Sequence, residues 1–223
     1  MHCPLCGHGR TVFYHQDARR PYRQCGCCQL VFVPPAYRLS PAAEKAHYDL
    51  HDNDPGDPGY RRFLSRLFEP VRQRVDPPAR GLDFGSGPGP TLSVMFAEAG
   101  YDMAIYDPFY APDDGVLRRT YDFVTASEVA EHLHAPGEVF TRLWNLIPPG
   151  GWLGLMTKLV SSQSAFANWH YKNDPTHVCF FSRDTFTWWA GRTGCVATFV
   201  GQDVILLRKP PQPTATAVRV HRH

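Results

Sequence analysis

The glycine-rich stretch DFGSGPGP, residues 83–90, constrains the fold of this chain more strongly than any other segment. It follows a short run of strand type, 81–84, and precedes a segment of helix type, 91–99. Its three glycines permit positive φ angles and let another molecule approach the backbone closely. In open α/β sheets, ligands bind beyond the carboxyl ends of the strands, at loops of this kind. The stretch therefore predicts an α/β domain with a ligand site at residues 85–89.

Segments of strand and helix type alternate after this loop, which predicts a doubly wound, mostly parallel sheet. The last two strand-type runs are joined by only three residues, 201–203, so they must pair in antiparallel fashion. Before the loop, apolar residues recur at helical spacing over 60–75, where Pro70 could kink the helix. The other expected strands are 103–106, 121–127, 152–157, 195–200 and 204–208, and the other expected helices are 41–48, 136–146 and 184–193.

The order of glycines and acids in the loop distinguishes two classes of ligand. The dinucleotide fingerprint reads G-x-G-x-x-G, whereas Gly85, Gly87 and Gly89 form G-x-G-x-G with a proline next. Asp83 stands two residues before the first glycine, where its carboxylate would repel a pyrophosphate. A ligand with an ammonium group would instead be attracted to this carboxylate. The loop therefore favours a cofactor that carries a charged amino group.

The segment LDFGSGPG resembles motif I of the class I S-adenosyl-L-methionine-dependent methyltransferases, and the resemblance extends over residues 60–209. The stretches YDFVTASEVAEHL, PPGGWLGLMT and DPTHVCFFS resemble later parts of that family in the same order. The resemblance implies that Asp83 binds near the methionine amino group and that Asp107, 22 residues after Gly85, binds the ribose hydroxyls. The implied cofactor-binding residues are Asp83, Phe84, Gly85, Ser86, Gly87, Gly89, Asp107, Pro108, Phe109, Ser127 and Glu128.

One segment departs from the family pattern. Only thirteen residues separate Asp107 from Tyr121, where the family usually has a helix and a third strand. The segment is rich in proline and acid, so we assign no third strand to it. Phe109 and the backbone of 126–127 are the expected neighbours of the adenine.

Four of the seven cysteines form two C-x-x-C pairs, Cys3 with Cys6 and Cys25 with Cys28, separated by 18 residues. Each pair can place two thiolates on a tight turn, and two such turns complete a tetrahedral zinc site. A segment this short has almost no core of its own, so the metal would supply its folding energy. The alternative is a set of reduced thiols without metal. We predict one structural Zn²⁺ per chain, and the module resembles one that precedes some methyltransferase domains of this type.

Two segments carry candidates for a general base. Glu128, Glu131 and His132 follow the carboxyl end of a predicted strand and face the expected substrate cleft, and histidine titrates near neutral pH. The stretch 169–177 lies between a strand and a helix, where inserts often form substrate lids. Each side chain could instead have a packing or surface role, and methyl transfer needs a base only if the acceptor must lose a proton. The candidate catalytic residues are His132, His177, His170 and Tyr171.

The predicted domain organisation has four parts. A small β zinc ribbon at 1–38 is followed by a linker with N-terminal helices at 39–75, a Rossmann-like methyltransferase domain at 76–210 and a flexible tail at 211–223. The resemblance implies S-adenosylmethionine and Zn²⁺ as cofactors. It also implies a small-molecule methyl acceptor, methylated at oxygen, nitrogen or carbon.

Two alternatives stay open at this point. Residues 1–38 contain five arginines and one aspartate, a net charge of +4 (5 − 1), so the ribbon could hold a nucleic acid and make this an RNA methyltransferase. The short segment after Asp107 would instead suit a non-catalytic binding or regulatory protein with a degenerate fold. The chain has no apolar run of membrane-spanning length and no secretory signal, so we expect a cytoplasmic protein without a membrane partner.

Overall fold

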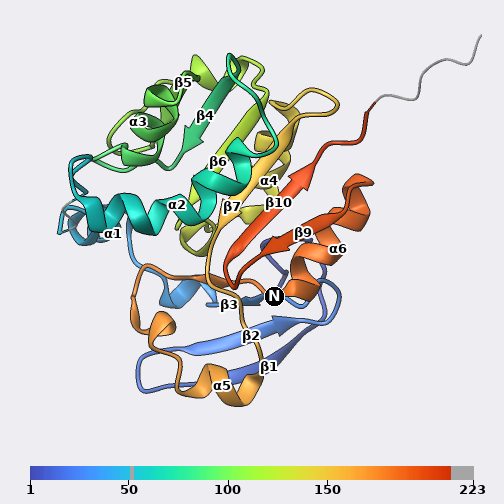
Figure 1. The fold of residues 1–223 in the computed structure, drawn as a ribbon. Coiled ribbons are helices and arrows are strands. Elements are labelled where there is room, and N and C mark those ends of the chain that lie inside the picture. Colours follow the sequence, from blue (N-terminus) through green and yellow to red (C-terminus); the bar gives the residue numbers. More distant parts are fainter. Residues whose placement is uncertain (51–52, 212–223) are drawn as a thin grey trace, which may run out of the picture.

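The computed structural model describes residues 1–50 and 53–211, which form a large sheet flanked by helices and a small sheet beside it (Figure 1). The large sheet has six strands, in the order β5 (Asp102–Tyr106), β4 (Arg80–Phe84), β6 (Phe123–Ser127), β7 (Trp152–Met156), β10 (Val204–Arg208) and β9 (Ala197–Val200). The first four are parallel, and β10 is antiparallel to both β7 and β9. This arrangement confirms the predicted doubly wound, mostly parallel sheet with an antiparallel last strand.

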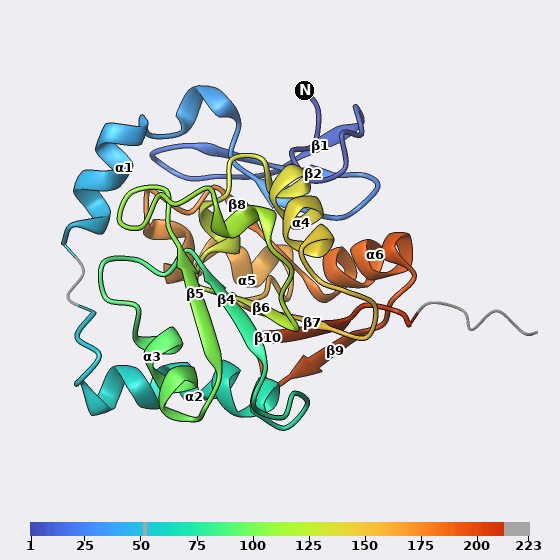
Figure 2. The same ribbon diagram turned by 90° about the horizontal axis from the view of Figure 1, so that it is seen from above.

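Helices cover both faces of the large sheet (Figure 2). They are α2 (Pro58–Arg72) and α3 (Thr91–Glu98) on one face, and α4 (Pro136–Asn145) and α6 (Arg183–Thr193) on the other. Phe96 of α3 packs on Phe123 of β6 with ring centroids 4.9 Å apart. On the opposite side Phe140 of α4 meets Trp189 of α6 edge to face at 5.8 Å. Pro70 stands buried inside α2, which continues past it.

The segment between β5 and β6 contains no strand of the large sheet, in agreement with its short length. It makes one isolated bridge, between Asp107 and Ala111, and one 3₁₀ turn, Val116–Arg118. Among the described residues, β5 therefore forms an edge of the large sheet.

The small sheet combines the N-terminal segment with a strand from the second half of the chain (Figure 1). Its order is β1 (Thr11–Gln16), β2 (Pro21–Cys25), β3 (Val31–Phe32) and β8 (Cys179–Phe180). Val31 pairs with Phe180, and the Val33 amide donates to the Val178 carbonyl at 2.8 Å. The ribbon expected at 1–38 is thus completed by residues from 178–180 and does not close on itself.

Short helices complete the connections. The helix expected at 41–48 is α1 (Pro41–Tyr48), and α5 (Gln163–Ala167) packs Phe166 against Tyr14 of β1 with ring centroids 5.3 Å apart. Three further 3₁₀ turns are Pro35–Tyr37, Ala130–His132 and His170–Asn173.

Most of the predicted C-terminal tail, residues 212–223, lies outside the described residues. Within the described ranges, no helix combines the length and the apolar character that crossing a bilayer requires. The predicted boundaries at 38, 75 and 210 remain predictions.

Arg20 joins the small sheet to the loop that follows α5. Its guanidinium is buried and donates to three carbonyls, those of Lys172 (2.9 Å), Asp174 (2.8 Å) and Pro175 (2.9 Å). Its Nε also donates to the Tyr22 hydroxyl at 3.1 Å. One buried cation thus satisfies several carbonyls of a loop distant in sequence and holds that loop on the small sheet.

Other arginines of the ribbon also bond the protein itself. Arg23 donates to the hydroxyl and the carbonyl of Thr11. Arg38 donates to the carbonyls of Val33 (3.0 Å) and His134 (2.9 Å). Arg20, Arg23 and Arg38, which carry much of the positive charge of residues 1–38, therefore form hydrogen bonds within the protein.

We expect Arg20→Met to lower the free energy of unfolding by about 2–4 kcal/mol, because it leaves buried carbonyls without a donor. The neighbouring Arg19 is exposed and donates to Asn173, so Arg19→Met should cost less than about 1 kcal/mol. Urea unfolding of the two variants tests this, and equal losses would contradict it.

Candidate functional site

A cavity of about 730 Å³ lies at the carboxyl ends of β4, β5 and β6. Its volume is in the range of small-molecule and cofactor sites. Most of the residues predicted for the cofactor or for catalysis line it, namely Phe84, Gly85, Ser86, Gly87, Asp107, Pro108, Phe109, Ser127, Glu128, His132 and His177. The fold therefore brings together four loops that are far apart in the sequence.

Part of the cavity wall comes from the segment before β4, which the sequence analysis did not connect with the site. Tyr48 of α1 and Tyr60 and Phe63 of α2 line the cavity. Their only signal in the sequence is aromatic residues on helices ahead of the glycine loop. A Cβ atom at Gly89 would lie 1.7 Å from the carbonyl oxygen of Asn53. Gly89 is therefore needed for the close approach of this segment, and it does not line the cavity.

The first two glycines of the loop have backbone conformations that other residues rarely adopt. Gly85 has φ +74°, and a Cβ atom there would lie 2.4 Å from Cγ2 of Val129. Gly87 has φ +64°, and only the side-chain amide of Asn53, at 3.5 Å, would meet its Cβ. The Gly85 amide donates to the Tyr106 carbonyl at 2.7 Å, which ties the loop to the end of β5. The loop is thus held open as a bare turn of backbone.

The Asp107 carboxylate connects the loops after β4 and β5. Oδ2 accepts from the Gly87 amide at 3.0 Å, and Oδ1 accepts from the amides of Phe109 (2.8 Å) and Tyr110 (3.1 Å). Asp107 lines the cavity, and Oδ2, which accepts from one amide only, retains a lone pair for a ligand hydroxyl.

Asp83 does not lie where the sequence led us to expect it. It is 4% exposed, it does not line the cavity, and it accepts from the Thr125 hydroxyl at 3.0 Å. Burial raises the pKa of the Asp83 carboxyl to about 7. The expected direct contact between Asp83 and an ammonium group is therefore not supported by this position behind the cavity wall.

Two of the four catalytic candidates also lie away from the cavity. His170 is exposed, and its Nε2 is 3.2 Å from Nζ of Lys158. Tyr171 is buried, and its hydroxyl donates to Oε1 of Glu131. Neither residue lines the cavity. The Tyr171 hydroxyl positions the Glu131 carboxylate, and His170 faces solvent.

His132 and His177 do meet, together with a carboxylate that the sequence analysis noted without assigning it a role. Their ring centroids are 4.7 Å apart. Glu131 is fully buried, with Oε1 4.0 Å from Nε2 of His132. Glu128, directly after β6, has φ +52°, which is costly for a residue other than glycine and often marks a functional site.

Burial controls the charges of this group. Burial, and next the neighbouring His132, lower the pKa of His177 to about 4, so its imidazole is neutral at pH 7. Burial, and next Glu131, raise the pKa of Glu128 to about 8, and burial raises the pKa of Glu131. Two adjacent carboxyl groups thus resist ionisation in the absence of a nearby positive ligand.

Several polar atoms of residues that line the cavity are buried without a hydrogen-bond partner in the described part of the chain. Within the described residues, the Ser86 hydroxyl, the Ser127 hydroxyl and Oε1 of Glu128 have no hydrogen-bond partner. Buried polar atoms are rarely left in this state, because each costs free energy unless a ligand or water bonds it. Their position on the wall is what a polar ligand would require.

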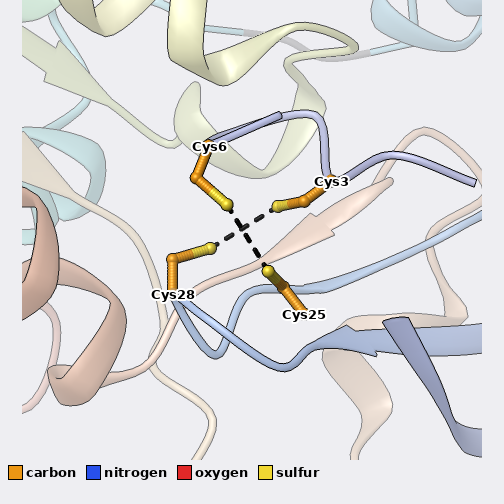
Figure 3. A group of neighbouring side chains, drawn as sticks. All are labelled: Cys3, Cys6, Cys25 and Cys28. Carbon is orange, nitrogen blue, oxygen red and sulfur yellow. Dashed lines mark hydrogen bonds between the residues drawn. The ribbon is translucent and has the colours of Figure 1, made fainter. Parts of the chain in front are cut away.

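The side chains of Cys3, Cys6, Cys25 and Cys28 point toward a common centre (Figure 3). The Cys3 and Cys28 sulfurs are 3.5 Å apart, as are those of Cys6 and Cys25, and all four lie within 4.8 Å of one another. Cys27 is exposed and lies outside this group. The first C-x-x-C turn rests on α4, where the Gly137 amide donates to the carbonyl of Pro4.

Residues 57–198, more than half of the chain, match the family described as a methyltransferase domain. No curated protein matches the sequence significantly. The 1,6-didemethyltoxoflavin-N1-methyltransferase of Burkholderia thailandensis, solved with S-adenosylhomocysteine, is similar at TM-score 0.54 and 15% identity, over 89% of this chain and 99% of that one. A SAM-dependent methyltransferase from Archaeoglobus fulgidus is similar at TM-score 0.51 and 15% identity, over 67% and 94%. At these identities the likeness shows the fold alone.

The raised pKa of Asp83 leads to a pH-dependent prediction. Because the protonated form is favoured in the fold, ionisation should cost stability as the pH rises from about 4 to about 7, by up to about 4 kcal/mol. Asp83→Asn carries no charge, so its stability relative to wild type should increase between pH 5 and pH 8. Urea unfolding at both values tests this, with exposed Asp102→Asn as the control. A difference that does not change with pH would refute it.

Proposed function

This chain belongs to the methyltransferase domain family and is an S-adenosylmethionine-dependent methyltransferase, and from that premise we propose that it methylates a small molecule. One observation carries the proposal. A single cavity of about 730 Å³ joins the glycine loop to Glu128, His132 and His177. A donor held on the loop would then face an acceptor held beside the two histidines.

The residues of the cavity fit the proposed cofactor. The bare backbone at Gly87 leaves room for the amino-acid end of S-adenosylmethionine, whereas Gly85 lets Val129 pack against the loop. The hydroxyls of Ser86 and Ser127 lack partners among the described residues and would bond its polar groups. Asp107 would accept from the ribose hydroxyls. Phe84, Pro108 and Phe109 line the same wall and would pack on the cofactor.

S-adenosylmethionine supplies a methyl group that its positively charged sulfur already activates. The protein must then align acceptor and donor and exclude water from the reaction. Tyr48, Tyr60 and Phe63 line the cavity and would serve both purposes. The expected catalytic roles of His132 and His177 remain predictions, and His170 and Tyr171 lie outside the cavity.

The form of the site favours a small molecule over RNA. The cavity has aromatic residues on several sides, which suits a ring-shaped or partly apolar acceptor. An RNA methyltransferase would need the ribbon arginines for phosphates. Arg20, Arg23 and Arg38 instead donate to groups of the protein itself.

We also propose that the four-cysteine group binds one structural Zn²⁺. Tetrahedral Zn–S bonds of about 2.3 Å place sulfurs about 3.8 Å apart, which the observed separations fit. Cys3, Cys6, Cys25 and Cys28 would hold the ion, and it would tie the chain start to the turn after β2. Through Arg20 this ribbon supports the loop that carries His177.

The cofactor proposal predicts that wild-type protein binds S-adenosylhomocysteine in calorimetry. Gly87→Leu should weaken this affinity at least tenfold, because the new side chain would enter the cavity. Gly150→Leu is the matched control, since Gly150 also has a positive φ and open space around its Cβ but lies outside the cavity. Wild-type protein that fails to bind the ligand would contradict the proposal.

The zinc proposal predicts about one equivalent of zinc per chain in freshly purified, reduced protein. Cys28→Ser should lose the metal and lower the melting temperature, since Cys28 is fully buried in the group. Cys27→Ser should retain it, because Cys27 is exposed beside the group. Metal analysis that finds no zinc in the wild type would exclude the site.

A further inference from the structure

A second group of metal-ligand side chains lies at the cavity, apart from the cysteines: His132 and His177 line the cavity, and Glu131 is fully buried next to His132. The potential ligand atoms of Glu131, His132 and His177 all lie within 4.8 Å of one another. Two of the residues come from the turn after β6 and the third from the loop before β8. Two imidazoles and a carboxylate are a common ligand set for divalent first-row metals.

The histidine from the loop is already prepared as a ligand. Nδ1 of His177 is 2.7 Å from the Tyr171 carbonyl oxygen. Because a carbonyl oxygen can only accept a hydrogen bond, Nδ1 must carry the proton. Nε2 then carries the lone pair. A metal-binding histidine usually donates a hydrogen bond from its other ring nitrogen in this way, because that bond fixes the ring orientation and the tautomer. The lowered pKa of His177 agrees with a neutral ring.

The carboxylate has one oxygen in use and one available. Oε1 of Glu131 accepts from the Tyr171 hydroxyl, whereas Oε2 has no partner within the described residues. The side chain is fully buried, so water does not compensate Oε2 at the protein surface. An unpaired buried carboxylate oxygen is expensive, and a cation beside it would remove that cost.

Tyr171 therefore orients both Glu131, through its hydroxyl, and His177, through its carbonyl. Arg20 in turn holds the loop that follows Tyr171, by its bonds to Lys172, Asp174 and Pro175. Glu131 and His177 are consequently both held in place by a residue outside the group. This is the support that a preformed metal site requires.

We propose that Glu131, His132 and His177 bind one divalent metal ion, of the Mn²⁺, Fe²⁺ or Zn²⁺ class, on the wall of the cavity. This site is distinct from the four-cysteine group, and its ligands are imidazole and carboxylate groups instead of thiolates. Glu128 lies beside it, with its buried Oε1 also without a partner in the described chain. The ion therefore compensates two carboxylates that otherwise repel each other.

The position of the ion specifies the acceptor further, and this step rests on the proposed methyl transfer. A cation on the cavity wall would bind an acceptor hydroxyl and lower the pKa of that hydroxyl. The O–H bond breaks and its proton passes to Glu128, while the oxygen forms a bond to the methyl carbon. The carbon–sulfur bond breaks, and its electron pair remains on the sulfur. In this arrangement His132 and His177 are ligands and not proton acceptors.

Mn²⁺ alone is the probe for the site, because it prefers nitrogen and oxygen ligands and leaves the cysteine group untouched. Electron paramagnetic resonance titration of the full chain, without cofactor or acceptor, should find about one bound Mn²⁺. His177→Gln and Glu131→Gln should each weaken this binding at least tenfold. His170→Gln, an exposed histidine outside the group, should bind as wild type does.

Circular dichroism and zinc content verify that each variant is folded, and His177→Gln alone decides the result if Glu131→Gln does not fold. Wild-type protein without saturable Mn²⁺ binding would overturn the proposal, as would equal binding by His177→Gln. Binding of S-adenosylhomocysteine is measured on the same samples. Retained cofactor binding without Mn²⁺ binding then rejects the metal site while leaving the methyltransferase proposal intact.

Discussion

The common direction of β4, β5 and β6 is the constraint on which the rest of the site depends. Parallel strands end at the same edge of a sheet, so the loops that follow them must meet there. The glycine loop, Asp107 and Glu128 each follow one of these strands, and all of them line one cavity. The first loop meets this requirement with glycines, since Gly85 and Gly87 have positive φ angles, whereas the loop after β6 has a positive φ angle at Glu128.

The small sheet adds a second requirement. Segments that are distant in the sequence must be held against the edge of the large sheet where the cavity lies. Pairing of Val31 with Phe180 completes the sheet, and Arg20 binds the carbonyls of the adjoining loop. Both contacts lie close in sequence to His177, which depends on this loop for its position. The small sheet is therefore part of the architecture of the cavity and not an appendage to it.

Prediction from sequence succeeded where the signal is local. The glycine loop and α1 lie where the sequence indicated, and most of the expected cofactor residues line the cavity. It did not indicate that Asp83 is buried, pairs across the sheet with Thr125 and does not line the cavity, and the binding role of Asp83 stays a prediction. Both Asp83 and Asp107 follow or end strands, and only their burial and partners distinguish them.

The order of strands and helices, the bare loop and the spacing of the C-x-x-C pairs could be read directly from the residues, because each depends on neighbours a few positions apart. The meeting of Glu131 with His177, and of β3 with β8, required the folded molecule. These groups are separated by 46 and by about 150 residues. These contacts depend on the pairing of β3 with β8 and on the buried Arg20 guanidinium that binds the loop before β8, and no local spacing in the sequence encodes either.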